Sequence, residues 1–420
     1  MREYIPRVVD SGLEEDLSLF GTLVLRGPKW CGKITIGRRY AKSEISMTDP
    51  AGDFAGRLMA TADPATAMEG PTPRLIDEWQ EVPKLWDAAR FECDRRGDPG
   101  QFILTGSSTP HDAAQPMHSG VGRFSVLRMD TMTLFESGRS TGEIPLSRLL
   151  SGDTFTRAQG SMSGLPSVAE AVCRGGWPQS VGLSTKAAMR IAAEYVQTVA
   201  DSDISRLDGV RRSPDKVNAL LASLARNEST LAGVKAIVDD MGGELARNAV
   251  SQYLSALKRI YVVDDVPAWS PALRSPVKLR SVSKRHLVDP SLAVAALGAN
   301  EGSLIRDPKT LGLLFESLVI HDLKVYARPL DAGVCHYHDA ADLEVDAIVS
   351  RRNGDWAAFE VKMGPSGIDE GAASLLALEK KMTEYGEKPP VAKCVVVAYG
   401  APAYVTDEGI QVVPLDVLAP

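Results

Sequence analysis

The segment Gly27-Pro28-Lys29-Trp30-Cys31-Gly32-Lys33 constrains the fold more than any other part of this 420-residue chain. It follows the apolar run 22–25 and precedes a helical pattern, which is the usual context of a phosphate-binding loop. In such a loop, glycines let backbone N–H groups converge on phosphate oxygens, the next helix presents its positive end, and the lysine reaches the terminal phosphates. We therefore expect this segment to bind a nucleoside triphosphate, with ATP as the cofactor.

The loop departs from the usual pattern at one position. Ser or Thr normally follows the lysine and ligates Mg²⁺. This chain has Ile34 there, and its hydroxyl comes one place later, at Thr35. We include both residues in the expected nucleotide site, but ATP binding is a firmer expectation than ATP hydrolysis. Two hypotheses stay open: an ATPase, or a nucleotide-dependent switch with little or no hydrolysis.

A second nucleotide motif lies at residues 73–80, where a short apolar strand ends in Asp77 and Glu78. In P-loop enzymes a strand-end Asp holds the Mg²⁺ shell, and a following Glu can polarise the attacking water. The alternative is an exposed acidic turn. The next apolar strand, 101–104, ends at Thr105 and Ser107, which either sense the γ-phosphate or form a polar loop. Strands alternating with helices predict a parallel sheet with its site at the strand ends.

Composition narrows the classes of function without choosing one. The formal net charge is −7, so any contact with DNA must come from a local basic surface. Five cysteines without a CxxC pair argue against a zinc knuckle and against a disulfide framework, and they suit a reducing compartment. No apolar run approaches the roughly 18 residues that span a bilayer. We expect a cytoplasmic protein that does not contact membranes.

Several segments together resemble the prokaryotic AAA+-type ATPases that carry a C-terminal DUF4143 region. They are residues 27–33, 75–80, 104–108, 118–123, 134–138 and 175–178. The resemblance implies self-association. It also implies that Arg123 stabilises the transition-state charge in its own site or in a neighbour's. An ordinary surface arginine is the alternative.

The middle of the chain predicts a winged helix-turn-helix. After a long helical stretch at 180–205, three helices (217–226, 230–238 and 247–257) precede a strand at 261–263, with a Gly242-Gly243 turn before the last helix. In that fold the last helix enters the major groove. Winged helices also serve protein contacts, so DNA is one of two expected partners. The residues expected to contact DNA are Arg247, Asn248, Ser251, Gln252, Lys258 and Arg259, and the residues expected to meet phosphates are Arg274, Lys278, Arg280, Lys284 and Arg285.

The C-terminal part has the order helix, strand, turn, strand, helix, strand. Its Glu-Val-Asp and Phe-Glu-Val-Lys strings resemble the PD-(D/E)xK nuclease core, in which carboxylates hold Mg²⁺ beside a catalytic lysine. The resemblance implies metal ligands at Asp346 and Glu360, an added ligand at Glu316 in the preceding helix, and a catalytic Lys362. A salt-bridged strand pair is the alternative. His336 and His338, just upstream, are expected to be plain strand residues rather than metal ligands.

Taken together, these patterns predict an α/β protein of three domains. Residues 1–200 form a P-loop AAA+-type parallel-sheet domain with a helical lid or connector, residues 201–288 a winged-helix domain, and residues 289–420 a small restriction-endonuclease-like α/β domain. The expected function is an ATPase coupled to DNA.

Overall fold

The computed structural model describes residues 4–109, 120–153, 155, 157–271 and 282–420. The chain divides into two compact units. The first contains residues 1–131, 201–212 and 255–262, and the second contains residues 132–200, 213–254 and 263–420. This division differs from the three expected domains, because residues 132–200 pack with the C-terminal half of the chain.

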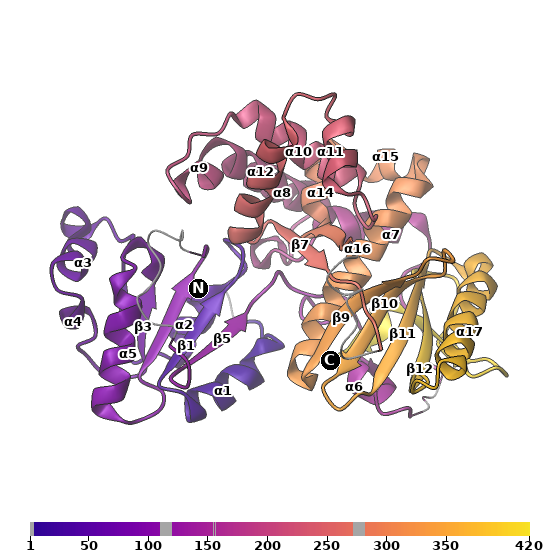
Figure 1. Ribbon diagram of the computed structural model, residues 1–420, viewed down its shortest axis with the longest axis horizontal. Coiled ribbons are helices and arrows are strands. Elements are labelled where there is room, and N and C mark those ends of the chain that lie inside the picture. Colours follow the sequence, from indigo (N-terminus) through magenta and orange to yellow (C-terminus); the bar gives the residue numbers. More distant parts are fainter. Residues whose placement is uncertain (1–3, 110–119, 154, 156, 272–281) are drawn as a thin grey trace. The chain divides into compact units, whose positions relative to one another are not determined.

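The first unit is built on a five-stranded sheet with the order β2-β3-β4-β1-β5, in which all paired strands are parallel (Figure 1). The predicted parallel sheet is therefore confirmed. Its elements are α1 (Val9–Leu19), β1 (Thr22–Arg26), α2 (Lys33–Tyr40), β2 (Ser43–Ser46), α3 (Ala51–Ala62), α4 (Pro64–Ala67), β3 (Arg74–Asp77), α5 (Lys84–Arg96), β4 (Phe102–Gly106) and β5 (Phe124–Arg128).

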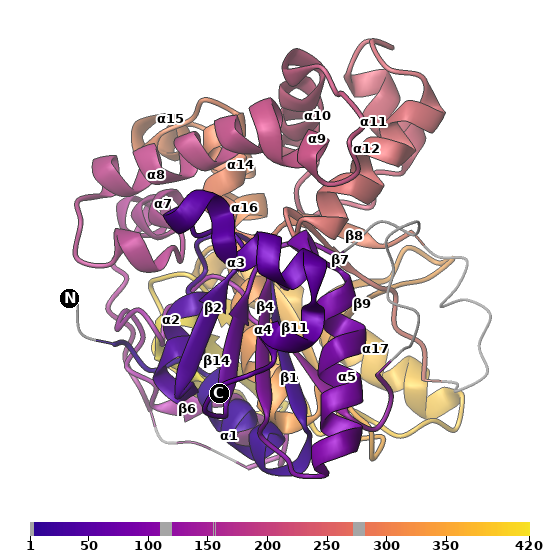
Figure 2. The same ribbon diagram turned by 90° about the vertical axis from the view of Figure 1, so that its left-hand side faces the viewer.

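Helices cover both faces of this sheet because side chains alternate along each strand. Val24 of β1 packs in one apolar cluster with residues of α3, α4 and α5, which lie in front of the sheet in Figure 2. Its neighbours Leu23 and Leu25 pack in a second cluster with α1 and α2. The three-layer arrangement leaves the carboxyl ends of the strands as the edge where loops meet.

The long helix expected at 180–205 is present in part. A 3₁₀ turn at Pro178–Ser180 precedes α8 (Thr185–Thr198), and a π-helical turn at Val199–Asp203 leads into the short α9 (Ile204–Arg206). Other elements before and after α8 in the second unit are β6 (Ile144–Pro145), α6 (Leu146–Leu149), α7 (Leu165–Arg174), α14 (Pro290–Ala296) and α15 (Glu301–Arg306).

Three helices and an antiparallel strand pair follow in the middle of the chain. They are α10 (Pro214–Arg226), α11 (Val234–Asp240), α12 (Arg247–Arg259), β7 (Val263–Val266) and β8 (Lys284–Leu287). Gly242 and Gly243, before α12, have φ of 65° and 75°, so the predicted turn is present. The expected strand at 261–263 begins two residues later, at Val263.

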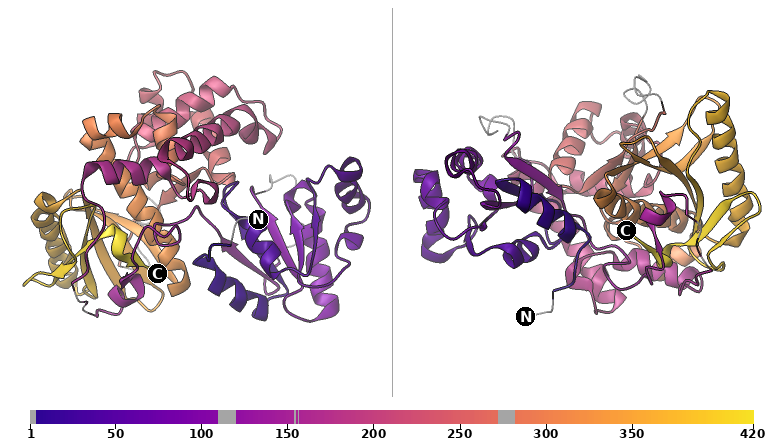
Figure 3. Two further views of the ribbon diagram at one scale, coloured as in Figure 1. Left: turned by 180° about the vertical axis from the view of Figure 1, so that it is seen from behind. Right: turned by 90° about the horizontal axis from the view of Figure 1, so that it is seen from below.

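The C-terminal part is an α/β layer with a six-stranded mixed sheet in the order β13-β14-β12-β11-β10-β9, drawn in orange and yellow in Figure 3. The strands β9, β10 and β11 are antiparallel, and β12 runs parallel to β11. Both α16 and α17 pack against the sheet. The elements are α16 (Pro308–Ala327), β9 (Ala332–His338), β10 (Glu344–Arg351), β11 (Trp356–Lys362), α17 (Ile368–Glu384), β12 (Ala392–Val397), β13 (Tyr404–Val405), β14 (Ile410–Pro414) and β15 (Leu418–Ala419).

Two further findings bear on the sequence predictions. All five cysteines are free thiols in the structure. Within the described ranges, no helix combines the length and the apolar character that crossing a bilayer requires.

Candidate functional site

The phosphate loop joins the end of β1 to the start of α2, and two glycines allow its path. A Cβ atom at Gly27 would lie 1.9 Å from the carbonyl oxygen of Met129, so no other residue fits there. Gly32, the residue before α2, has φ of +105°, which favours glycine. It provides no side-chain cap for the helix. The first N–H groups of α2 are therefore offered to an external acceptor.

Lys33 lies inside the loop that precedes it. Its Nζ donates hydrogen bonds to the carbonyl oxygens of Gly27 at 2.9 Å and Pro28 at 2.6 Å, and only 6% of the residue is exposed. Both partners are neutral oxygens. A phosphate that approached α2 would give the ammonium a charged acceptor, which makes a stronger hydrogen bond than a neutral one. The loop is therefore suited to a triphosphate.

Asp77 ends β3 between two hydroxyl groups on the neighbouring strands. Ser46 and Thr105 are its register partners on β2 and β4. Thr105 Oγ1 donates to Asp77 Oδ1 at 2.7 Å, and Ser46 Oγ donates to Asp77 Oδ2 at 3.0 Å. Thr105 is fully buried. It therefore orients Asp77, and the predicted direct contact with the γ-phosphate is not available to it in this arrangement.

Glu78 follows in a left-handed conformation, with φ of 53°. Its carboxylate accepts hydrogen bonds from Ser107 Oγ at 2.9 Å and from the Gln80 side chain. The tight turn that begins at Asp77 thus aims two successive carboxylates in different directions, and each is held by its own donors. Asp77 and Glu78 lie at the same edge of the sheet as the phosphate loop, as the sequence predicts.

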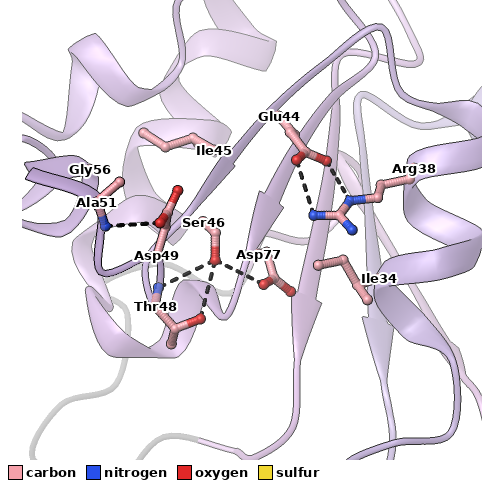
Figure 4. A pocket seen from close by; sticks show the side chains of 10 residues that line it. All are labelled: Ile34, Arg38, Glu44, Ile45, Ser46, Thr48, Asp49, Ala51, Gly56 and Asp77. Carbon is pink, nitrogen blue, oxygen red and sulfur yellow. Dashed lines mark hydrogen bonds and ion pairs between the residues drawn. The ribbon is translucent and has the colours of Figure 1, made fainter. Parts of the chain in front are cut away.

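A cavity of about 460 Å³ adjoins Asp77 and the start of α2 (Figure 4). Ile34 and Asp77 line it, whereas Thr35 is exposed and is not part of its wall. In Figure 4, Ser46 lies between Asp77 and Thr48, with hydrogen bonds to both. Ser46 is not part of any sequence motif, although it is the polar residue that ends the strand next to β3. The residues lining the cavity are Ile34, Arg38, Glu44, Ile45, Ser46, Thr48, Asp49, Ala51, Gly56 and Asp77.

Two basic residues of the predicted site have partners elsewhere in the first unit. Lys29 donates to Asp203 Oδ1 at 2.6 Å. Arg123 immediately precedes β5, and its carbonyl oxygen accepts a hydrogen bond from Thr22 N at the start of β1. Since β1 and β5 are parallel, Arg123 lies at the amino ends of the strands, opposite the phosphate loop. Its side chain pairs with Asp94 at 2.6 Å. The prediction that Arg123 acts in its own site is therefore wrong.

In the second unit, a buried lysine lies among the carboxylates that the sequence assigned to a metal ion. Lys284 is 2% exposed, and its Nζ is 2.7 Å from Glu344, 2.9 Å from Glu316 and 3.3 Å from Asp346. Burial alone would lower the pKa of Lys284, but the three carboxylates outweigh burial and raise it. The expectation that Lys284 meets DNA phosphates is therefore wrong, because its charge is already neutralised inside the protein.

The other members of the predicted nuclease set lie beside this cluster. Asp346 Oδ2 accepts a hydrogen bond from Val361 N at 2.8 Å, and Lys362 Nζ lies 3.2 Å from Glu360 and 3.1 Å from Glu370. Burial, followed by repulsion from Asp346, raises the pKa of Glu360 to about 8. The same two causes, in the same order, raise the pKa of Glu316 to about 8. The ammonium groups of Lys284 and Lys362 face more carboxyl groups than they can neutralise, so some of these carboxyl groups keep a proton.

The structure does not gather Glu316, Asp346 and Glu360 as a ready metal site. Among the described residues, no three His, Cys, Asp or Glu side chains are placed to hold a metal ion together. His336 is buried, and burial, followed by the charge of Lys284, lowers its pKa to about 4. It lies in β9 as a strand residue, in line with the sequence prediction. His338 also lies in β9, 3.3 Å from Asp342.

The outer face of α12 is polar, as predicted. Val250, Leu254 and Leu257 are buried, whereas the polar residues of the opposite face are exposed, with Arg259 intermediate. Arg259 also donates to the carbonyl oxygen of Thr109 at 2.9 Å. Of the predicted basic run beyond β7, Arg274, Lys278 and Arg280 lie outside the described residues, and Arg285 pairs with Asp265 at 3.5 Å. The exposed predicted residues of α12 are Arg247, Asn248, Ser251, Gln252 and Lys258.

Comparison with known proteins gives three family matches along the chain. Residues 20–137 match an AAA domain, residues 165–303 match a domain of unknown function, DUF8612, and residues 311–418 match another, DUF4143. The AAA match contains the phosphate loop, Asp77 and Glu78. The DUF4143 match contains Glu316 and the strands β10 and β11.

Whole-chain likenesses are more distant. Two uncharacterized proteins, from Mycobacterium tuberculosis and Mycobacterium bovis, are each 24% identical over 94% of this chain and 80% of their own length. Among solved structures, a Walker-type ATPase of Pyrococcus abyssi aligns at 15% identity with a TM-score of 0.41, covering 70% of this chain and 96% of its own. A RuvB mutant of Thermotoga maritima aligns at 16% identity with a TM-score of 0.27, covering 62% of this chain and 88% of its own.

Neither structural likeness is close enough to transfer the role of any residue. The family matches are more informative, because the AAA match contains segments 27–33, 75–80, 104–108 and 118–123, on which the sequence resemblance rests. The chain therefore combines an N-terminal AAA domain with a C-terminal DUF4143 region, as the sequence resemblance implies.

Proposed function

We propose that the first unit binds ATP together with Mg²⁺ and that nucleotide binding controls contacts made by the rest of the chain. The observation that carries this proposal is Lys33, a buried lysine whose partners are the neutral carbonyl oxygens of its own loop. The uncapped start of α2 adds backbone donors beside it. ATP would place its phosphates against these groups, and Mg²⁺ would lie toward Asp77, the strand-end carboxylate of the cavity.

Calorimetry with ATP and Mg²⁺ tests this proposal directly. Lys33→Ala removes one charge-assisted hydrogen-bond donor, and we expect about 10- to 100-fold weaker ATP binding. Lys42→Ala is the matched control, because Lys42 is an exposed lysine that follows α2 by two residues. Equal affinities of wild type and Lys33→Ala would overturn the proposal. Phosphate release, measured on the same samples, decides between an ATPase and a switch.

DNA is the proposed partner of the middle region. The order α10, α11, α12, β7, β8 is that of a winged helix, and α12 presents a polar face where such a fold reads the major groove. The net charge of the whole chain is negative, so the contact would rest on this local face. A purely protein-binding winged helix is the competing possibility.

Salt dependence separates these two possibilities. If Arg247 neutralises a phosphate, Arg247→Ala should weaken binding to every duplex sequence and reduce the slope of log affinity against log salt by about one. Lys380→Ala on α17 is the control, since the Lys380 side chain is 79% exposed far along the sequence from α12. Duplex affinity that is unchanged in Arg247→Ala would remove α12 as the DNA-contacting element.

For the C-terminal part we propose a nuclease-like fold that does not cleave DNA while Lys284 holds its carboxylates. The order α16, β9, β10, β11, α17, β12 supports the nuclease-like fold. The contacts of Lys284 with Glu316, Glu344 and Asp346 favour a binding role without DNA cleavage over nuclease activity. Linear, branched and single-stranded DNA with Mg²⁺ or Mn²⁺ should therefore stay intact. Cleavage by wild type that Asp346→Asn abolishes would contradict this proposal.

We also propose that the protein self-associates and that Arg123 of one subunit contacts the nucleotide of another. Because Arg123 lies at the amino ends of the strands, it could act only on nucleotide held by a neighbouring subunit. Sedimentation with and without ATP tests assembly itself.

A further inference from the structure

We infer that Ser46 supplies, beside Asp77, the hydroxyl oxygen that the phosphate loop lacks at Ile34. In this role Ser46 is a positioning residue for the Mg²⁺ shell of bound ATP, so the inference rests on the proposed function. Nothing in the loop motif points to this residue. The position of β2 next to β3 brings it to the site.

The start of α2 forms one side of the cavity. Ile34 stands where a metal-ligating hydroxyl is usual, and its half-buried side chain packs with the apolar cluster below the loop and lines the cavity. Thr35, one residue along the helix, points about 100° away, is exposed and is absent from the cavity wall. The side chains at the start of α2 therefore offer the cavity an apolar surface where Mg²⁺ requires oxygen.

Ser46 and Asp77 lie in another part of the cavity wall. Ser46 Oγ lies 3.0 Å from Asp77 Oδ2, accepts a hydrogen bond from Thr48 N at 3.3 Å, and lies 3.2 Å from Thr48 Oγ1. These contacts fix the hydroxyl at the edge of the cavity (Figure 4). A hydroxyl has one donor and two acceptor positions. Ser46 donates to Asp77, and both of its acceptor positions face Thr48. Ser46 therefore orients Asp77, and rotation of the Thr48 hydroxyl away from it would free one acceptor position for a cation or its water.

Thr105 provides the other hydroxyl that binds Asp77, but its position differs from that of Ser46. Thr105 holds Oδ1 from a fully buried position, whereas Ser46 holds Oδ2 and belongs to the cavity wall. Of these two hydroxyls, only Ser46 adjoins the space where the metal shell would form. Residues that orient a metal's ligands typically change metal affinity about 10- to 100-fold when they are removed.

The test compares wild type, Ser46→Ala, Ile34→Thr and the double variant. ATP affinity is measured by calorimetry with Mg²⁺ and with EDTA, and the signal of bound Mn²⁺ is followed by electron paramagnetic resonance. We expect Mg²⁺ to strengthen ATP binding in wild type and Ser46→Ala to reduce that gain about 10-fold or more, with the EDTA affinity unchanged. Ile34→Thr returns a hydroxyl to α2, so the double variant should recover most of the gain.

The control is Ser43→Ala, at the other end of the same strand, where the serine hydroxyl donates to the carbonyl oxygen of Pro71. A merely structural role for Ser46 would lower the EDTA affinity too, and Ile34→Thr would not restore the Mg²⁺ gain. If Mg²⁺ strengthens ATP binding as much in Ser46→Ala as in wild type, Ser46 does not position the Mg²⁺ shell, although the proposed nucleotide site is still supported. If wild type binds no ATP in either condition, the nucleotide site and the role of Ser46 both fail.

Discussion

Lys33 in the first unit and Lys284 in the second are both buried, 6% and 2% exposed, but their partners differ in charge. The Nζ of Lys33 contacts two neutral carbonyl oxygens of its own loop, whereas the Nζ of Lys284 contacts three carboxylates. A phosphate can improve on a carbonyl oxygen as an acceptor, and it cannot improve on three carboxylates. The charge of Lys33 is therefore available to a ligand, and that of Lys284 is used inside the fold.

The two sites also differ in how rigidly their lysines are held. An ion pair buried in the protein is attractive mainly because leaving either charge alone there is unfavourable. Lys284 therefore secures β8 to α16 and β10, and any metal ion that reached these carboxylates would have to displace it. The hydrogen bonds of Lys33 to neutral carbonyl oxygens do not hold its loop with a buried ion pair of this kind.

Removal of the Lys284 charge should have the largest effect. In Lys284→Met the three carboxylates lose their cation, and breaking a buried pair in this way typically costs about 3–5 kcal/mol of stability. Urea denaturation followed by circular dichroism measures the change. Lys235→Ala is the control, because Lys235 pairs with Asp239 on the exposed side of α11 and its loss should leave the midpoint near that of wild type. An unchanged midpoint in Lys284→Met would contradict the contrast between the two lysines.

Lys33→Met should destabilise the protein far less than Lys284→Met, since only hydrogen bonds to neutral oxygens are lost. Wild type and Lys33→Met should differ most in thermal stability when ATP is added. A ligand at 100 times its dissociation constant stabilises the folded state by about 2.7 kcal/mol. Thermal unfolding of wild type should therefore shift upward with ATP and Mg²⁺, and that of Lys33→Met should not at the same concentration. Equal shifts in both proteins would show that ATP binds without this lysine.

The raised pKa of Glu316 predicts a dependence of stability on pH. Its carboxyl group has a pKa of about 8 in the folded protein against 4.5 for the ordinary side chain. Between these values the folded state holds more protons than the unfolded state, so stability falls as pH rises from about 5 to 8. Glu316→Gln should make that fall shallower by up to about 1.4 kcal/mol per pH unit. Glu384→Gln, an exposed change on α17, should leave it as in wild type.

Denaturation at a series of pH values measures this effect. Glu360 has a similarly raised pKa and keeps part of the pH dependence in Glu316→Gln. A wild-type stability that stays level from pH 5 to 8 would show that the carboxyl groups around Lys284 are ionised throughout.

The features that the sequence predicts are those encoded within short segments. The loop before α2, the strand end at Asp77 and the turn at Gly242 and Gly243, where φ is 65° and 75°, each depend on residues close in sequence. The parallel sheet follows from the alternation of strands and helices. In these cases the residues of one short segment determine its local conformation, so the conformation predicted from the sequence is the one in the structure.

The features that sequence reasoning missed depend on pairing between distant segments. Lys284 belongs to a basic run that looks solvent-exposed, and only the packing of β8 beside α16 and β10 brings it to Glu316 and Asp346. Ser46 reaches Asp77 because β2 is the strand that pairs with β3. The position of Arg123 depends on strand direction, which a motif does not reveal.

The smallest expected effect concerns Arg123, which lies at the opposite end of the strands from Lys33. Its exposed pair with Asp94 should contribute at most about 1 kcal/mol, and Arg123→Ala should leave the ATP affinity of a dilute subunit unchanged. Arg90→Ala is a close control, because Arg90 pairs with the same Asp94. If Arg123 serves a neighbouring subunit, ATP hydrolysis per subunit should rise with the concentration of wild type and of Arg90→Ala, but not of Arg123→Ala. Weaker ATP binding by dilute Arg123→Ala would instead show that the arginine acts in its own site. That result would contradict the position that the parallel pairing of β1 and β5 gives to Arg123.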